Sequence, residues 1–162
     1  MNEIETLYRQ HASALFRFAL GLCGNKSQAE DVVSETFVRI LTRAPHIETQ
    51  TALGYLLAVA RNVFITEGRV RRREVPLPEE IRAPDHDPIG LLDNQIHLAS
   101  VVRAIRCLPE GERAALLLRV DHGLSYEEIA AVLGTSVVAA KVRVHRARLR
   151  LAMAEDPEER KP

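Results

Sequence analysis

The sequence of 162 residues has no tryptophan, and only 4% of its residues are aromatic. Cysteine is scarce too: Cys23 and Cys107 lie far apart among apolar neighbours. Two distant cysteines do not make the disulfide framework of a small secreted domain, so we expect two buried, reduced thiols. An excess of charge is also absent, because 22 basic residues balance 22 acidic ones. The total charge therefore indicates no class of partner, although the distribution of charge does.

Long apolar runs are missing as well. No run approaches the roughly 20 residues that a membrane helix needs. Residues 1–10 are charged where a signal peptide would be apolar. We therefore expect a cytoplasmic protein with no membrane span.

The motifs of common enzymes and metal proteins are absent. The histidines form no His-x-x-x-His pair and the cysteines form no Cys-x-x-Cys pair. There is neither a glycine-rich phosphate loop nor a nucleophile elbow. Asp85, His86 and Asp87 are a candidate for weak cation binding, but neighbours in a flexible loop do not preset a coordination shell. We expect no catalytic residues, no metal site and no cofactor.

The abundant residues are those of helices: 46% of the chain is hydrophobic, with many alanines, leucines, arginines and glutamates. Residues 76–88 break this pattern with four prolines, four acids and a single arginine, which excludes a regular helix there. We therefore predict an all-α protein of two small helical domains joined by a flexible, acidic, proline-rich linker. The predicted boundaries are 1–73 for the first domain, 74–92 for the linker, 93–154 for the second domain and 155–162 for a charged tail.

The first domain shows apolar residues at helical spacing from its start, and Gly21 and Gly24 interrupt the pattern. Ser27 and Glu30 form a capping box, which predicts that a second helix begins there. A third helix is predicted over residues 52–66. Three such helices can bury one modest core.

The second domain has clearer signals for where its helices begin and end. A helix is predicted over residues 96–107, and Pro109 suits the start of the next one. Ser125 and Glu128 form another capping box, which opens a short helix. Gly134 ends that helix and permits a tight turn with positive φ.

A final helix is predicted from a cap at Thr135 or Ser136 to about residue 151. Its apolar stripe is Val137, Ala140, Val144, Ala147 and Leu151. Residues 137–150 also hold five lysines or arginines and no acid. A short capped helix, a glycine turn and a longer basic helix are typical of a helix-turn-helix DNA-binding domain. The alternative for such a helix is a solvated basic face with no partner.

Over residues 4–152 the chain resembles the extracytoplasmic-function (group IV) sigma factors of the sigma-70 family, which direct RNA polymerase to promoters. The segments that carry the resemblance are residues 24–25, 29–37, 55–62, 108–113, 123–130 and 141–148. It implies that the first domain is sigma region 2, which binds the polymerase and the −10 element. It implies that the second is region 4, which binds the −35 element. The implied partners are the β′ clamp helices and β flap of core RNA polymerase, promoter DNA and an anti-sigma factor.

The resemblance also assigns roles to residues. The residues implied for core-polymerase binding are Asp31, Glu35 and Arg39. Those implied for −10 DNA binding are Arg61, Asn62, Arg69, Arg71, Arg72 and Arg73. Those implied for −35 DNA binding are Ser136, Val138, Ala139, Lys141, Val142, Arg143, His145, Arg146 and Arg148.

The sequence departs from the family pattern in the final helix. Ala139 and Val142 stand where the family usually has threonine and serine, so two hydroxyls that could bond phosphate or base are replaced by methyl groups that can touch thymine. A promoter sequence therefore cannot be transferred from relatives. The alternative function is a helix-turn-helix regulator that binds DNA without polymerase, which would leave the first domain without a role.

Overall fold

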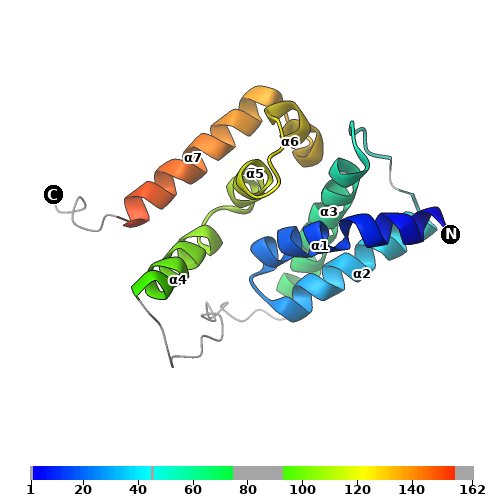
Figure 1. Cartoon of the computed structure of the whole chain (residues 1–162), viewed down its shortest axis with the longest axis horizontal. Coiled ribbons are helices and arrows are strands. Elements are labelled where there is room, and N and C mark those ends of the chain that lie inside the picture. Colours follow the sequence, from blue (N-terminus) through cyan, green and yellow to red (C-terminus); the bar gives the residue numbers. More distant parts are fainter. Residues whose placement is uncertain (1, 45, 75–92, 156–162) are drawn as a thin grey trace.

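The computed structural model describes residues 2–44, 46–74 and 93–155, and the regular structure in these ranges is all helical (Figure 1). The helices are α1 (Glu3–Cys23), α2 (Lys26–Thr42), α3 (Ala52–Glu74), α4 (Asp93–Arg106), α5 (Glu110–Val120), α6 (Tyr126–Leu133) and α7 (Val137–Glu155). The predicted all-α class is confirmed. Glu74 and Glu155, predicted as the first residues of the linker and of the tail, instead end α3 and α7. The rest of the predicted acidic linker and charged tail, with the candidate cation site at residues 85–87, lies outside the described residues.

Helices α1, α2 and α3 form an N-terminal unit, in which α2 runs back along α1 and α3 packs against both (Figure 1). Its core consists of apolar side chains that each helix places on its inner face: Leu15, Phe18, Leu22, Ala29, Val32, Val33, Phe37, Leu56, Leu57, Ala60 and Val63. These residues recur at helical spacing within each helix, as the sequence pattern of this domain predicts. The unit therefore follows from helical periodicity.

The predictions at the helix ends of this unit need correction. Gly24 does end α1, in the left-handed conformation with φ of 68°, but Gly21 lies inside the helix. The N-cap of α2 is Asn25, whose Oδ1 accepts a bond of 3.1 Å from the backbone N–H of Gln28, so Ser27 is not the cap. Asn25 directly follows the Gly24 turn, and an asparagine cap is at least as favourable as serine.

Helix α3 also continues past its predicted end at residue 66. It runs to Glu74 through Gly68, because a single glycine weakens a helix without breaking it. At its start, the hydroxyl of Thr51 accepts a bond of 3.0 Å from the backbone N–H of Gly54. The arginine-rich segment after residue 68 is thus helical.

Helices α4 to α7 form a C-terminal unit. Its helix boundaries confirm the predicted capping box of Ser125 and Glu128 and the predicted turn at Gly134. Ser125 and Glu128 exchange both bonds of a capping box at the start of α6. Gly134 ends α6 with φ of 66°, and the hydroxyl of Ser136 then accepts from the backbone N–H of Ala139 to cap α7. The predicted stripe of α7 faces inward, with Ala140, Val144 and Ala147 buried. Helices α6 and α7 therefore form a helix-turn-helix.

The two units pack against each other through α1 with α5 and α3 with α6. Buried apolar residues of both units form one continuous cluster. Gly21 explains part of the fit, because a methyl group at that position would lie 2.7 Å from Cδ1 of Leu117. We call this packing the closed arrangement.

Replacing Ser125 with alanine removes the side-chain half of the capping box. We expect the free energy of unfolding to fall by about 1 kcal/mol, the usual cost of an N-cap serine. Urea denaturation followed by circular dichroism measures it.

The matched control is Ser34→Ala, an exposed position within α2 that caps nothing. It should leave stability unchanged or slightly higher, since alanine is the better helix former. Equal losses in the two variants would contradict the capping role of Ser125.

Candidate nucleic-acid interface

The outer face of α7 is the first candidate surface. Most of the predicted −35 residues are exposed there: Ser136, Val138, Lys141, Val142, His145, Arg146 and Arg148. Ala139 is only partly exposed. Val138 is exposed to 71%, which is high for a large apolar side chain and suits contact with base methyl groups. The face thus combines positive charge with apolar contact groups.

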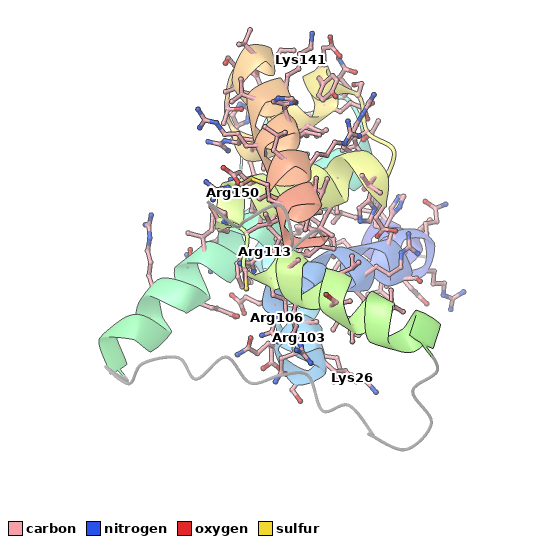
Figure 2. The ribbon with its side chains drawn as sticks, turned by 90° about the vertical axis from the view of Figure 1, so that its left-hand side faces the viewer. Lys26, Arg103, Arg106, Arg113, Lys141 and Arg150 are labelled. Carbon is pink, nitrogen blue, oxygen red and sulfur yellow. The ribbon has the colours of Figure 1, made fainter. Side chains whose placement is uncertain are left out.

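One tyrosine anchors the basic residues at the start of this face. The guanidinium carbon of Arg119 lies 4.4 Å from the ring centroid of Tyr126, and Nζ of Lys141 lies 5.7 Å from it. These are cation–π distances. They tie the first turn of α7 to α5 and α6, so Lys141 is held at the exposed tip of the motif (Figure 2).

Two other basic residues of α7 turn toward α5. Arg143 is partly buried beside Gly111, where a methyl group would lie 3.3 Å from its Nη1. Arg150 makes an ion pair of 2.8 Å with the buried carboxylate of Glu112. Arg143, predicted to bind DNA, therefore also packs inside the C-terminal unit.

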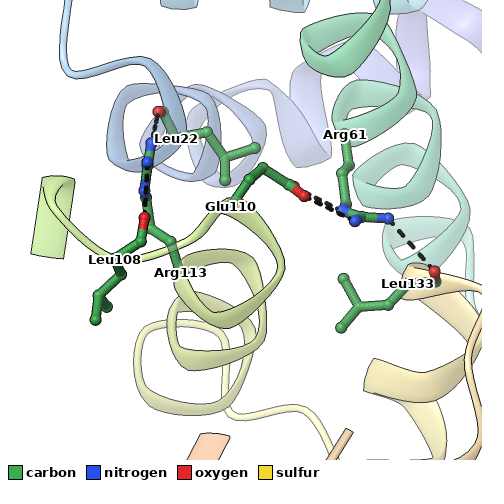
Figure 3. A network of polar contacts seen from close by, with 6 residues as sticks. All are labelled: Leu22, Arg61, Leu108, Glu110, Arg113 and Leu133. Carbon is green, nitrogen blue, oxygen red and sulfur yellow. Dashed lines mark hydrogen bonds and ion pairs between the residues drawn. The ribbon is translucent and has the colours of Figure 1, made fainter. Parts of the chain in front are cut away.

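Arg61 is the predicted −10 residue whose surroundings differ most from expectation. The resemblance assigns it to −10 DNA, which requires an accessible side chain, but its side chain is only 12% exposed. Its Nε and Nη2 donate to the two carboxylate oxygens of Glu110 at 2.8 and 2.9 Å, and Nη1 donates to the carbonyl of Leu133 at 3.4 Å (Figure 3). Arg61 thus binds α5 and α6 across the unit boundary.

The other predicted −10 residues are more open. Asn62 and Arg69 are exposed on α3. Residues 71–73 belong to the last turn of α3, and their side chains lie outside the described part of the chain.

A second arginine, Arg113 of α5, joins the units on the other side. It donates to the carbonyl of Leu22 in α1 and to the carbonyls of Arg106 and Leu108, at 3.1 and 3.0 Å for the latter two (Figure 3). Burial lowers the pKa of Arg113, an effect that Glu110 opposes and Arg106 adds to. Carbonyl oxygens replace the lost water of the buried guanidinium.

His122 closes the same boundary from the C-terminal end of α5. Its side chain is 1% exposed, and its ring lies edge-on to Phe18 of α1 at 5.8 Å between centroids. Burial lowers its pKa, while Asp121 acts in the opposite direction and Arg17 of α1 reinforces the lowering. Arg17 and Asp121 themselves lie 3.5 Å apart across the boundary.

Sequence reasoning missed Glu110, Arg113 and His122 as contact residues. Their partners lie far away along the chain, so no local spacing could reveal them. The segment 108–113 was singled out, but only by resemblance.

The predicted polymerase-binding residues lie on one helix. Asp31 is exposed on α2, and Glu35 and Arg39 form an i, i+4 ion pair of 3.3 Å. Glu35 therefore has an intrahelical partner, and Asp31 is the more accessible carboxylate.

No group of three or more metal-ligating side chains occurs within the described ranges. None of the helices described here is both long and apolar enough to span a bilayer.

Comparison with known proteins identifies both units. The family of sigma-70 region 2 matches residues 7–74, and that of sigma-70 region 4 matches residues 98–151. EcfG of Rhodopseudomonas palustris, an ECF RNA polymerase sigma factor, is 34% identical over 140 residues, covering 86% of this chain and 77% of EcfG. The chain belongs to the extracytoplasmic-function sigma factors. The resemblance seen in the sequence is thereby confirmed.

Other relatives agree. The sigma factor is 34% identical to SigE of Mycolicibacterium smegmatis over 152 residues, 91% of this chain but only 59% of SigE, so it spans about three fifths of that relative. It is 32% identical to SigL of Mycobacterium tuberculosis over 158 residues, covering 94% of this chain and 89% of SigL.

Solved structures show the same fold. The sigma factor matches RpoE from Bartonella quintana, solved with the anti-sigma factor NepR, with a TM-score of 0.78, 29% identity and coverage of 96% and 98% of the two chains. It matches CnrH, solved with the cytosolic domain of CnrY, with a TM-score of 0.69, 26% identity and coverage of 96% and 88%.

The buried His122 predicts a pH dependence of stability. Because its pKa is lowered in the folded chain, the folded state binds the proton less well than the unfolded state, in which histidine titrates near pH 6.5. The stability that neutral His122 contributes is complete above about pH 6.5. It is lost as the pH falls toward the lower pKa of His122 in the folded chain. We expect the free energy of unfolding in urea to decrease between pH 8 and pH 5.5.

His122→Gln should flatten this slope, whatever its effect on stability at pH 8. The control is His145→Gln, because His145 is exposed on α7. An unchanged slope in His122→Gln would show that another group causes the dependence.

Proposed function

We propose that this sigma factor binds core RNA polymerase and directs it to promoters that carry a −10 and a −35 element. It acts in the cytoplasm as a specificity subunit and is not itself an enzyme. The observation that carries the proposal is the helix-turn-helix of the C-terminal unit. There α7 presents Lys141, Arg146 and Arg148 on an exposed face in a chain of this family.

The two units divide the work. The N-terminal unit, within residues 1–73, contacts the β′ clamp helices through the outer side of α2, with Asp31 as its most accessible charge. Asn62, Arg69 and the arginines at 71–73 approach the −10 DNA. The C-terminal unit, within residues 93–154, contacts the β flap and inserts α7 into the major groove of the −35 element.

The closed arrangement must open for Arg61 to reach DNA, because Glu110 and the carbonyl of Leu133 occupy its donors. Core polymerase would hold the two units apart at the spacing of two promoter elements. Two weak binding units that are held in this way gain affinity through effective concentration. The sigma factor would therefore select promoters only when it is bound to core polymerase.

An anti-sigma factor is proposed as a further partner. RpoE from Bartonella quintana was solved with the anti-sigma factor NepR, and CnrH was solved with the cytosolic domain of CnrY. Both sigma chains resemble this one along nearly its whole length. We propose that a comparable protein binds here and covers the polymerase-binding surface.

Run-off transcription from a genomic promoter library tests the function. Core polymerase with the sigma factor should give new start sites that share two sequence blocks upstream. Asp31→Lys should reduce these transcripts at limiting sigma concentration, because it reverses the accessible charge on α2. Glu30→Lys, an exposed neighbour on the same helix, should reduce them less.

No new transcript from a folded chain that binds duplex DNA alone would favour the polymerase-independent regulator. Equal effects of the two charge reversals would remove Asp31 from the polymerase interface.

A substitution of Arg146 tests whether α7 contacts bases or only phosphates. If it makes a bidentate contact with a guanine, Arg146→Ala should lower selectivity for the −35 sequence by about 1–3 kcal/mol. Competition binding of the polymerase holoenzyme to matched and mutated promoters measures this. Arg150→Ala is the control, because Arg150 pairs with Glu112. An equal loss on every sequence would mean that Arg146 contacts only phosphate.

A further inference from the structure

The two cysteines lie at the boundary between the units, one on each side. Cys23 is the last residue of α1, and Cys107 directly follows α4. Both are thiols in this structure, but Cys107 is exposed and Cys23 is half-buried. The prediction that both are buried was therefore wrong. Their exposure makes them accessible to small reagents.

Backbone contacts place the segments around the two cysteines together. Arg113 binds the carbonyl of Leu22, which precedes Cys23. The same guanidinium binds the carbonyls of Arg106 and Leu108, which flank Cys107. Oxygens bound to one guanidinium lie within a few ångströms of each other. Arg113 thus connects the backbone beside one cysteine to the backbone on both sides of the other; Figure 3 shows its bonds to Leu22 and Leu108.

A second contact joins the same segments independently. The guanidinium of Arg106, the residue before Cys107, lies against Gly24, the residue after Cys23. A methyl group at Gly24 would lie 2.3 Å from Nε of Arg106. Figure 2 shows Arg106 and Arg113 on the same side of the molecule. The neighbours of each cysteine therefore either bind Arg113 or, at Gly24 and Arg106, lie against each other.

Both sulfurs also lie within electrostatic reach of Arg113, since thiolates at Cys23 and Cys107 each raise its pKa. One positive charge thus faces both thiols across the unit boundary. A disulfide requires Cα atoms about 4.4–6.8 Å apart. Both cysteines lie at helix ends, and Gly24 next to Cys23 is in a left-handed turn.

We propose that Cys23 and Cys107 form an oxidisable pair whose disulfide locks the sigma factor in the closed arrangement. The reagent class is a peroxide. One thiolate attacks the peroxide oxygen, becomes a sulfenic acid and releases water after protonation. The second thiolate then attacks the sulfenic sulfur, and hydroxide leaves as a second water. Two thiols and one hydrogen peroxide thus give one disulfide and two waters, and a dithiol reductant reverses the change.

The consequence for transcription rests on the proposed function, whereas formation of the bond does not. In the locked chain the ends of α1 and α4 cannot separate, so Arg61 stays with Glu110 and Leu133. Oxidation would withhold Arg61 from the −10 DNA until the bond is reduced. The sigma factor would then sense oxidation without an anti-sigma protein.

The bond is tested on the full reduced chain treated with hydrogen peroxide. Non-reducing peptide mass spectrometry should find Cys23 linked to Cys107 within monomers. The rate should not depend on protein concentration. It should be about tenfold or more faster than in urea-unfolded chain, because folding raises the effective concentration of the pair.

Cys23→Ser and Cys107→Ser should each abolish the product. Three outcomes would overturn the pair: a dimer linked through Cys107 alone, oxidation of each cysteine to sulfinic acid without a link, or a rate no higher than in urea.

Run-off transcription with core polymerase tests the lock. The oxidised wild-type chain should lose at least tenfold of its transcript and regain it with dithiothreitol, while Cys23→Ser should keep its activity after the same peroxide treatment. Full activity of a chain shown to carry the bond would overturn the lock. Mass spectrometry tests the disulfide independently of transcription. A reduced chain that gives no transcript would count against the proposed function and not against the disulfide.

Discussion

The bidentate contact between Arg61 and Glu110 is the interaction on which the closed arrangement most depends. A planar guanidinium matched to a carboxylate gives both strength and a fixed geometry. Because Arg61 is largely buried, breaking the pair without replacing it would leave a poorly solvated charge. In the proposed function, polymerase or DNA provides a new partner for Arg61 when the units separate. Arg61, which the family resemblance assigns to promoter DNA, is thus one of the residues that join the two units in the closed arrangement.

The fold could be predicted from the sequence wherever its cause is local. The capping box of Ser125 and Glu128, the positive φ of Gly134 and the buried stripe of α7 depend on residues within a few turns of one another. Local reasoning failed where two local solutions compete. Ser27 offers a good cap, but Asn25 lies directly after the glycine turn and takes that role.

The candidate surfaces were predictable only in part, because exposure depends on tertiary packing. A helical wheel puts Arg61 on a polar face, and nothing within α3 shows that a carboxylate 49 positions away will cover it. Gly21 is a second example. As a glycine it suggests a helix break, but in the structure it lies inside α1 and leaves room for Leu117 of the other unit. The outer face of α7 was easier to predict, since the opposite, buried side shows in the sequence as one regular apolar stripe.

Helix α5 is short, yet it holds three partners at once. Glu110 binds α3, Arg113 binds the end of α1, and Glu112 pairs with Arg150 of α7. A displacement of α5 therefore acts on both surfaces proposed for DNA. Thermodynamic linkage makes the coupling reciprocal. If opening changes the affinity of α7 for DNA by some factor, DNA binding shifts the opening equilibrium by the same factor. In the proposed function, the −35 element would then act as an allosteric effector of the sigma factor as well as its binding site.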